Sequence, residues 1–576
     1  MTARVLLAVG VVAAALFLTG LGAAPFVDPP EGVHAAVALE MARTGDWITP
    51  RLDGVRYFDK PPLLYWLMAA GFAALGVSEW MARLPSALSA VGVAVVTAWI
   101  GVRLGGARLG LLSGLMVAAN LELFVFARLV KPDLLFVLFI TVALAAFVEA
   151  YGTDRRGAVL VFYASLGATV LAKDLLGAVG PLAVVALFFA LTGEREVRAR
   201  WLPWRGLAVL AAVAVPWYAA MEAASPGFLW YTVVDNHVLN VLQQRVFPDE
   251  DVPLRAVEFL AVTAIGFLPW TLALPWAVWR GLRGPWDTAE RRVWLLLALW
   301  TAVVLGLFTL SPFKLPHYGL PAFPAMALLV AKLWSDAVDG DAPAPAARAL
   351  VLPALVALIA LALAAWLAWQ GQLRLPAGAL PAADVAARNL AARGQEAPFA
   401  TAADLGPIFG GLALIFAAGA AGLAATVVMG RPLVAVGLLL AVMLASLPVT
   451  IQGFALFAQS RSVRPLAEAV ALRGTPRDVL AHEGPLETSA SWLLTLDRQV
   501  KIVNGLQSNL AIGATFADAA GVFWSAAELA AAWRGGARVF LLSAVKPERS
   551  VVRQLPPDRV HLLAEAGGRW LYSNRP

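Results

Sequence analysis

Charged side chains stand beside prolines in three short stretches of an otherwise apolar sequence. The stretches are "VRYFDKPPLLYW", "ARLVKPD" and "LSPFKLPHYGLP", and their ionisable residues include Asp59, Lys60, Arg128, Lys131, Asp133, Lys314 and His317. Because proline fixes its own φ and restricts the residue before it, the backbone aims Lys60 more narrowly than an ordinary loop would. Separated lysines and arginines facing acidic groups suit a phosphate ligand with carboxylate chemistry beside it.

The composition indicates the kind of protein in which these residues lie. The 576 residues are 60% hydrophobic and 14% charged, with a mean hydropathy of +0.75, whereas soluble domains are roughly one-quarter charged. Apolar runs of about 18 to 24 residues recur, each long enough to cross a bilayer as a helix. The sequence therefore predicts a polytopic α-helical membrane protein. The absence of cysteine excludes disulfides, thiolate metal sites and cysteine nucleophiles.

About thirteen transmembrane helices are predicted from these apolar runs. Their ranges are 4–24, 84–103, 107–127, 133–152, 157–172, 175–192, 205–223, 256–279, 293–310, 317–334, 349–370, 407–427 and 432–455. The first run continues directly into a polar loop, so we interpret it as a retained helix rather than a cleaved signal peptide.

The basic residues predict the orientation of these helices. With a cytoplasmic N-terminus, nearly every cytoplasmic loop carries arginine, as the positive-inside rule requires. These arginines are Arg103, Arg108, Arg155, Arg156, Arg195, Arg198, Arg200, Arg205, Arg280, Arg283, Arg291, Arg292 and Arg431. Their dispersal among short loops, at a net charge of +6, argues against nucleic-acid binding.

Three regions follow from this topology. Residues 1–455 form the transmembrane domain, in which residues 25–83 are the first outer loop and contain the interfacial helix "EGVHAAVALEMART". Residues 456–576 lie on the outer face, where short helical and strand-like segments alternate, as in "RPLAEAVAL" and "ARVFLLS". That alternation predicts a small extracytoplasmic α/β domain. We find no nucleotide-binding glycine loop in it.

Sorted by side, the charged residues outside the cytoplasmic loops gather at the outer face. They are Asp28, Glu31, Asp46, Asp59, Lys60, Arg128, Lys131, Asp133, Lys173, Asp174, Asp235, His237, Arg245, Lys314 and His317. Ionisable groups at a helix end or within membrane depth are unfavourable unless paired or hydrated, so such a gathering predicts a functional site. The alternative, that they are interfacial anchors, fits single members better than the whole set. A cleft there could bind a lipid phosphate and leave the lipid tail in the bilayer.

The same residues carry a family resemblance. From "EGVHAAVALEMARTGDWITPRLDGVRYFDKPPLLYWLMAAGFAALGVSEWMARLPSALSA", through Lys173, Pro216-Trp217 and "LPW" at 268–270, to "SPFKLPHYGLPAFPAMALL", the chain resembles the aminoarabinose lipid A transferase and protein O-mannosyltransferase superfamily. Members of this superfamily are C-type glycosyltransferases that use polyprenyl-phosphate sugars. The match is most specific over residues 41–86 and extends to about residue 334.

The resemblance implies a glycosyltransferase of the bacterial inner membrane. Such an enzyme moves one sugar from undecaprenyl or another polyprenyl phosphate to lipid A, another glycan or a protein, on the periplasmic face and with no nucleotide cofactor. Phosphate is already a fair leaving group, so positioning and charge neutralisation can supply much of the catalysis. The C-terminal domain is then expected to be periplasmic.

The resemblance also implies roles for individual residues. Lys60 matches the lysine that holds the lipid phosphate, and Asp133 matches the acidic residue that assists acceptor binding. Asp59 and His237 match the carboxylate and the histidine that bind a metal in the aminoarabinose branch, so a zinc ion is a further expectation. The remaining candidates for binding the donor phosphate or substrate are Tyr57, Arg128, Lys131, Arg245, Lys314 and His317.

The main departure from the family concerns its catalytic acidic residue. Where the family has an adjacent Asp-Glu pair, this sequence reads "VDPPEG", with Pro30 at the aspartate position and Glu31 in register. Proline cannot accept a proton, so three readings stay open: Asp28 takes the role, Glu31 takes it, or the protein is inactive. We expect Asp28 or Glu31, because the rest of the constellation is present. Asn240 stands where the family has an arginine, and Arg245 is the expected substitute.

Two other functions remain open. A transporter or flippase for a lipid-linked sugar would also need a cleft and charges for phosphate. Transporters, however, often show internal repeats and ionisable residues near the midplane, and this sequence shows no clear repeat. The other alternative is a catalytically inactive homologue that binds polyprenyl phosphate, and Pro30 is its best support.

Overall fold

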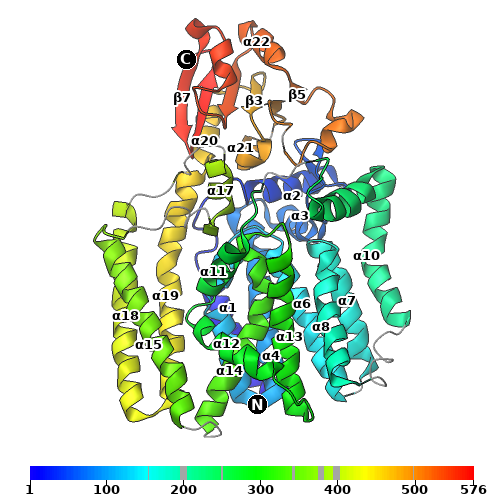
Figure 1. Ribbon diagram of the computed structural model, residues 1–576. Helices are drawn as coiled ribbons and strands as arrows, with labels where there is room; N and C mark the ends of the chain where they lie inside the picture. Colours follow the sequence, from blue (N-terminus) through cyan, green and yellow to red (C-terminus); the bar gives the residue numbers. More distant parts are fainter. Residues whose placement is uncertain are drawn as a thin grey trace.

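The computed structural model describes residues 1–153, 155–194, 204–247, 251–339, 344–373, 382–392, 398, 402–496, 498–506 and 508–576. In these residues a bundle of long apolar helices carries a domain with a mixed sheet at one end, and the N-terminus lies at the other end (Figure 1). The elements of the first loop, residues 25–83, lie between the bundle and the sheet domain.

The helices of the bundle coincide with the predicted apolar runs. They are α1 (Thr2–Leu18), α4 (Glu79–Ala118), α5 (Leu121–Ala127), α6 (Asp133–Thr153), α7 (Arg156–Ala172), α8 (Leu176–Thr192), α10 (Trp204–Ala224), α11 (Ala256–Gly266), η2 (Trp270–Ala273), α12 (Leu274–Leu282), α13 (Ala289–Leu310), η3 (Pro316–Ala322), α14 (Phe323–Asp339), α15 (Ala344–Trp369), α18 (Ala402–Met429) and α19 (Pro432–Arg461). A short helix, α17 (Val385–Ala392), precedes α18.

Seven of the described helices are long and apolar enough to cross a membrane, or eight if the bent pair Ala256–Gly266 and Trp270–Leu282 forms one span. Four shorter apolar helices, α1, α3 (Leu63–Leu75), α7 and α8, accompany them. The prediction of a polytopic helical membrane protein is confirmed at this level.

Helix α4 consists of two helices that fold back on each other. Its path breaks at Gly105 and Gly106, where Gly106 has a φ of +81°, a conformation that glycine adopts without strain. The two halves then touch through glycines, because a Cβ atom on Gly101 would lie 2.7 Å from the Cα of Gly110. Small residues allow such close packing between apolar helices. This break explains why the sequence showed two separate apolar runs, at 84–103 and 107–127.

The first loop, residues 25–83, forms a compact layer against the bundle. It contains α2 (Gly32–Thr44), a two-stranded hairpin of β1 (Arg51–Leu52) and β2 (Val55–Arg56), and α3. The α2 helix packs on α3 and also contacts α21 (Ser491–Leu496) of the C-terminal domain. Most of its residues are therefore buried, including every residue from Val33 to Leu39. The loop is thus covered by protein on both sides rather than lying open on the surface.

The C-terminal domain contains a six-stranded mixed sheet. Its elements are α20 (Arg464–Arg473), β3 (Val479–Glu483), η4 (Leu486–Ser489), α21, β4 (Lys501–Val503), β5 (Phe523–Trp524), α22 (Ala526–Arg534), β6 (Val539–Ser543), β7 (His561–Ala566) and β8 (Arg569–Ser573). The strand order is β5-β4-β3-β6-β8-β7, in which β5, β4, β3 and β6 are parallel and β8 runs antiparallel to both of its neighbours. The strand-like and helical segments expected from the sequence are present.

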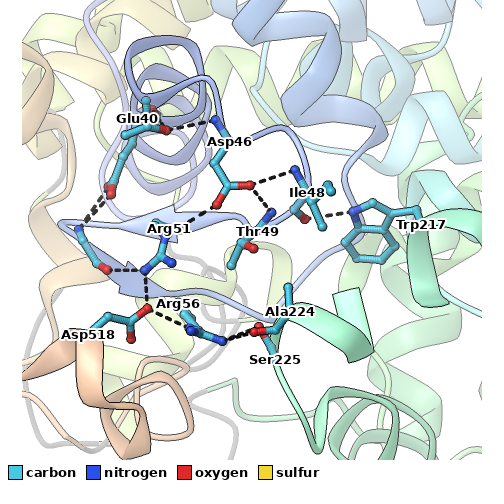
Figure 2. A network of polar contacts seen from close by, with 12 residues as sticks. Glu40, Asp46, Ile48, Thr49, Arg51, Arg56, Trp217, Ala224, Ser225 and Asp518 are labelled. Atoms are coloured by element: carbon cyan, nitrogen blue, oxygen red, sulfur yellow. Dashed lines mark hydrogen bonds and ion pairs between the residues drawn. The ribbon is translucent and has the colours of Figure 1, made fainter. Parts of the chain in front are cut away.

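Polar contacts tie the hairpin of the first loop to both neighbouring layers (Figure 2). Asp518 of the C-terminal domain pairs with Arg51 at 2.7 Å and with Arg56 at 2.8 Å. Arg56 also donates to the carbonyl of Ala224 at the end of α10, at 2.5 Å. The indole of Trp217 in α10 donates to the carbonyl of Ile48 at 3.0 Å. These contacts fix the loop between the helix bundle and the sheet domain.

Candidate active site

Two adjoining cavities lie among the first loop, the helix ends near it and the C-terminal domain. The larger has a volume of about 810 Å³ and the smaller about 320 Å³, and Asp59, Lys60, Lys173 and Tyr318 line both. The predicted site residues that line one or both cavities are Tyr57, Asp59, Lys60, Arg128, Lys131, Asp133, His237, Arg245 and His317. Asp28, Glu31 and Lys314 line neither. Most of the set that the sequence grouped by side therefore meets around one space.

Lys60 and Asp59 form an ion pair where the two cavities adjoin. The Lys60 Nζ lies 2.7 Å from Asp59 Oδ1, and both side chains keep part of their surface accessible. Although burial opposes ionisation, the Lys60 ammonium holds the pKa of Asp59 below its usual range. Pro61 and Pro62 then lead directly into α3. A fixed positive charge thus reaches both spaces from the first loop.

Asp133 at the start of α6 is held by two basic side chains from other elements. Lys173, at the end of α7, lies 2.5 Å from Asp133 Oδ1, and His317 of η3 places Nε2 3.2 Å from the same oxygen. Lys173 also lies 4.4 Å from the centre of the Tyr318 ring, a distance that allows a cation–π contact. Three distant segments of the sequence therefore converge on one carboxylate.

Arg128 lies at the larger cavity but also caps a helix. Its Nη2 donates to the carbonyls of Leu16 and Thr19, at 2.7 and 2.8 Å, at the end of α1. The guanidinium also lies 4.4 Å from the centre of the Phe124 ring. These contacts satisfy carbonyls that the end of a helix leaves without partners. Arg128 thus has a structural role, and its contact with a phosphate stays a prediction.

Glu31 is fully enclosed in a buried ion pair. Its carboxylate receives Nε and Nη2 of Arg83 at 2.8 and 2.7 Å, and also the backbone amides of Val27 and Val130 at 2.9 and 3.0 Å. Both charged side chains are inaccessible to solvent. A buried ion pair needs several such hydrogen bonds, because they offset the free-energy cost of removing both charges from water. The catalytic role expected for Glu31 stays a prediction, and this placement does not support it.

Asp28 binds the C-terminal domain. Its Oδ1 accepts from the amide of Ser491 at 3.1 Å, and its Oδ2 accepts from the Ser491 hydroxyl. Burial raises the pKa of Asp28 to about 6. The cavity wall beside it is formed by Pro29 and Pro30, whereas the Asp28 side chain points elsewhere. Its role as a proton acceptor also stays a prediction without support from placement.

Lys314 is buried and contributes its backbone instead of its side chain to a described hydrogen bond. Its carbonyl accepts from the amide of Leu254 at 2.9 Å. The position of Lys314 next to a cavity-lining segment, which includes Leu315, Pro316 and His317, shows why the sequence grouped it with the site. A role in phosphate binding stays a prediction.

His237 and Arg245 lie around the smaller cavity. His237 belongs to a π-helix, η1 (Trp230–Leu239), and its Nδ1 lies 2.6 Å from the carbonyl of Thr232, which leaves Nε2 as the potential metal ligand. Arg245 interacts with Asp235 at 3.4 Å and with Asn236. The orientation of Arg245 is therefore set by neighbours within its own segment.

The described residues contain no cluster of three or more histidine, aspartate or glutamate side chains that could bind a metal ion. Asp59 and His237 line the same small cavity, so they offer two candidate ligands at most. Structural zinc sites need four ligands, and catalytic sites need at least three from the protein in most known cases. A metal at this position would therefore require ligands from the substrate or water.

Sequence analysis missed residues that the C-terminal domain contributes to the larger cavity. These are Glu487, in η4, and Asn509. It also missed that His34 of α2 lines the cavity, where burial lowers its pKa to about 4 and its Nδ1 lies 3.1 Å from the Tyr65 hydroxyl. No local sequence pattern marks Glu487 as a site residue, because the first loop that it faces lies more than 400 residues earlier in the sequence.

The apolar helix bundle, the charged cavity at one end and the mixed-sheet domain that covers it have a counterpart among solved structures. The crystal structure of ArnT from Cupriavidus metallidurans bound to undecaprenyl phosphate is similar to this chain, with a TM-score of 0.78 and 22% identity, over 99% of this chain and 97% of that one. The apo form of the same protein gives a TM-score of 0.79 and 23% identity over the same shares of the two chains. At these identities the likeness establishes the fold.

The sequence comparisons point the same way. Residues 59–219 match the family model described as dolichyl-phosphate-mannose-protein mannosyltransferase. The chain is 33% identical over 353 residues to an undecaprenyl phosphate-alpha-4-amino-4-deoxy-L-arabinose arabinosyl transferase of Sodalis glossinidius, and 27% identical over 369 residues to one of Shewanella sediminis. These alignments cover 58% and 63% of this chain and 60% and 65% of the relatives. The resemblance is confirmed: the chain is related to the aminoarabinose transferases and the protein O-mannosyltransferase family.

Proposed function

We propose that this protein is an integral-membrane glycosyltransferase that takes a sugar from a polyprenyl phosphate, such as undecaprenyl phosphate, and transfers it to lipid A, another glycan or a protein. The observation that carries the proposal is the position of Lys60, a fixed positive charge facing two cavities. The fold shared with a protein crystallised with undecaprenyl phosphate supports this choice of donor.

The two cavities suggest how the donor lies. The smaller cavity has apolar walls from α8 and α13, including Leu176, Val179 and Leu307, which suit the polyprenyl tail. Its polar end carries Lys60 and Arg245, which suit the phosphate. As the bond between the sugar and the phosphate breaks, negative charge grows on the phosphate oxygen, and these cations stabilise it. The larger cavity leaves room for the sugar and for the acceptor.

Asp133 has a positioning role in this scheme. Because Lys173 and His317 hold one of its oxygens, the carboxylate keeps a fixed direction at the wall of the larger cavity. A fixed carboxylate can orient a sugar or acceptor hydroxyl by accepting its hydrogen bond. A zinc ion, if bound, would be held by Asp59 and His237 and would supply a further positive charge toward the phosphate. Metal analysis of the purified protein tests that part.

The orientation and the number of spans complete the proposal. We count thirteen spans by adding the second half of the broken helix α4, together with α14, α1, α7 and α8, to the seven long helices and the bent pair. Helix α3 is left in the first loop, as in the thirteen ranges predicted from the sequence. Thirteen spans with a cytoplasmic N-terminus put the cavities and the C-terminal domain, residues 456–576, on the periplasmic side of the inner membrane. The arginine-rich loops then lie in the cytoplasm.

The position of Pro30 favours one alternative, an inactive homologue that binds polyprenyl phosphate, because the two nearest acidic side chains, Asp28 and Glu31, bind other protein groups. Transfer and binding must therefore be measured separately. The described ionisable groups of the cavities gather at one end of the bundle, an arrangement that gives no support to a transporter.

The test uses purified protein, polyprenyl-phosphate sugars and candidate acceptors. We expect Lys60→Ala to reduce transfer by about 100-fold or more, since removing one donor to a developing oxyanion typically has an effect of that size. Lys546→Ala, at an exposed lysine of the C-terminal domain, is the matched control and should transfer like wild type. Binding of undecaprenyl phosphate without transfer from any donor supports the inactive homologue. Equal transfer by Lys60→Ala and wild type would sink the proposal.

A further inference from the structure

Glu487 is a buried carboxylate of the C-terminal domain that lines the larger cavity. Its relative exposure is 7%. Neither of its oxygens accepts a hydrogen bond of normal geometry from the described residues, although its own amide, the Ser508 side chain and the Leu510 amide lie close enough to favour its ionised form. Buried polar groups without partners are uncommon, and in a cavity they mark candidate functional groups.

Glu487 differs in this respect from the other described carboxylates of the larger cavity. Those carboxylates and their partners are Asp59 with Lys60, Asp133 with Lys173, Asp384 with Arg461, and Asp251 with Asn389. Each of these four carboxylates thus has at least one oxygen already held by a cation or an amide. Among the described carboxylates of the larger cavity, Glu487 is the one for which neither oxygen has an ion pair or a hydrogen bond of normal geometry.

The groups facing Glu487 come from the first loop and from its own domain. Tyr57 and Asp59 interact with it electrostatically, and His34 of α2 lines the same space in its neutral form, because burial lowers its pKa to about 4. On its own domain, Arg569 of β8 donates to the carbonyl of Thr488. Burial, reinforced by the charge of Asp59, raises the pKa of Glu487 to about 7.

The segment that carries Glu487 is fixed against the first loop. Four residues later, Ser491 donates its amide and its hydroxyl to Asp28. Gly32 packs so closely on this point that a Cβ atom there would lie 2.4 Å from the Ser491 nitrogen. Asp28 is therefore a positioning residue in this arrangement: it holds α21, and through it η4, beside the cavity.

We propose that Glu487 is the general base of the reaction, the group that accepts the proton of the acceptor hydroxyl. The inference rests on the proposed glycosyltransferase function. The acceptor oxygen forms a bond to the anomeric carbon, and the bond from that carbon to the polyprenyl phosphate oxygen breaks. The phosphate leaves with the electron pair, and the proton passes to the Glu487 carboxylate. Pro30 lines the same cavity and cannot take this role.

The experiment compares wild type and Glu487→Gln in transfer assays from pH 5.5 to 9. A positioned base contributes roughly 10²- to 10⁴-fold, so we expect Glu487→Gln to lose at least 100-fold in kcat. The wild type should lose activity below about pH 7 as Glu487 becomes protonated, and the variant should lack this dependence. Undecaprenyl phosphate should raise the Tm of both proteins equally. Glu468→Gln, at an exposed glutamate of α20, is the matched control.

Three results would overturn the inference. The first is a Glu487→Gln variant whose kcat for sugar transfer is within threefold of wild type and has the same pH dependence. The second is a Glu487→Gln variant whose Tm is well below that of wild type and no longer rises with undecaprenyl phosphate. That result would give Glu487 a structural role. The third is a wild type that neither binds undecaprenyl phosphate nor transfers sugar, in which case the proposed function fails first. An active wild type with an unaffected Glu487→Gln leaves the proposed function intact and removes only the role of Glu487.

Discussion

Asp133 shows how a single buried residue can depend on several distant elements. It is only 4% exposed, and its ion pair with Lys173 places two opposite charges 2.5 Å apart where neither side chain has much access to water. Removing one partner of such a pair is more harmful than removing both, because the remaining charge is left buried and unpaired. The pair therefore links the stability of the bundle to the geometry of the cavity.

A double variant separates these two effects. We expect Asp133→Asn to lower stability, by roughly 3 kcal/mol or more, since it leaves Lys173 without its carboxylate. Adding Lys173→Met should restore much of the Tm, because the unpaired charge disappears. Transfer should remain at least tenfold lower in the double variant, because the fixed carboxylate is still missing. Full recovery of transfer together with Tm would show that Asp133 serves only to neutralise Lys173.

The hairpin of the first loop is the element that joins the cavity to the C-terminal domain. At its turn, Asp53 adopts a φ of +57° and its carboxylate accepts from the amide of Val500 at 3.1 and 3.2 Å. Burial raises the pKa of Asp53 to about 8. The ordinary pKa of aspartate is about 3.9, so at neutral pH the folded protein holds a proton there that the unfolded chain has released.

Asp53 therefore makes stability depend on pH. Its favourable contribution is fully present below about pH 4, falls as the pH rises and is lost once the pH passes about 8. Asparagine tolerates positive φ and keeps a carbonyl that can accept from Val500. We expect Asp53→Asn to raise the Tm at pH 8 by several °C and to flatten the dependence between pH 5 and 8. A Tm at pH 8 equal to that of wild type would contradict the pKa assigned to Asp53.

Elements of this protein were predictable where one physical signal dominates. Long apolar runs have few alternatives to spanning helices, so each predicted range overlaps a described helix. Gly105 and Gly106 account for the gap between two of these ranges. The alternation in the C-terminal part likewise predicted strands such as β6, in the segment "ARVFLLS", whereas β5 and β7 were not predicted. Only part of the cavity lining could be predicted from the sequence. Glu31 and Asp28 are occupied by Arg83 and Ser491, and such partners are set by tertiary packing that no local pattern reveals.

At the scale of the whole molecule, the C-terminal domain completes the cavity as well as covering it. Glu487 and Asn509 enter the lining from the sheet domain, whereas Lys60 and Tyr57 enter from the first loop. The first loop and the C-terminal domain, which lie far apart in the sequence, thus meet at the site, while the N-terminus of α1 lies at the far end of the bundle (Figure 1). Chemistry at the cavity therefore requires both layers to stay on the same side of the membrane.

This requirement makes the orientation directly testable. The chain has no cysteine, so a single introduced thiol can be labelled without background. We expect Lys546→Cys, in the C-terminal domain, to react with a membrane-impermeant maleimide added to spheroplasts from the periplasmic side. Arg431→Cys, at an exposed position between α18 and α19, should react only after the membrane is permeabilised. The opposite pattern would place the cavities in the cytoplasm, where nucleotide sugars are made, and would remove the reason for a polyprenyl-phosphate donor.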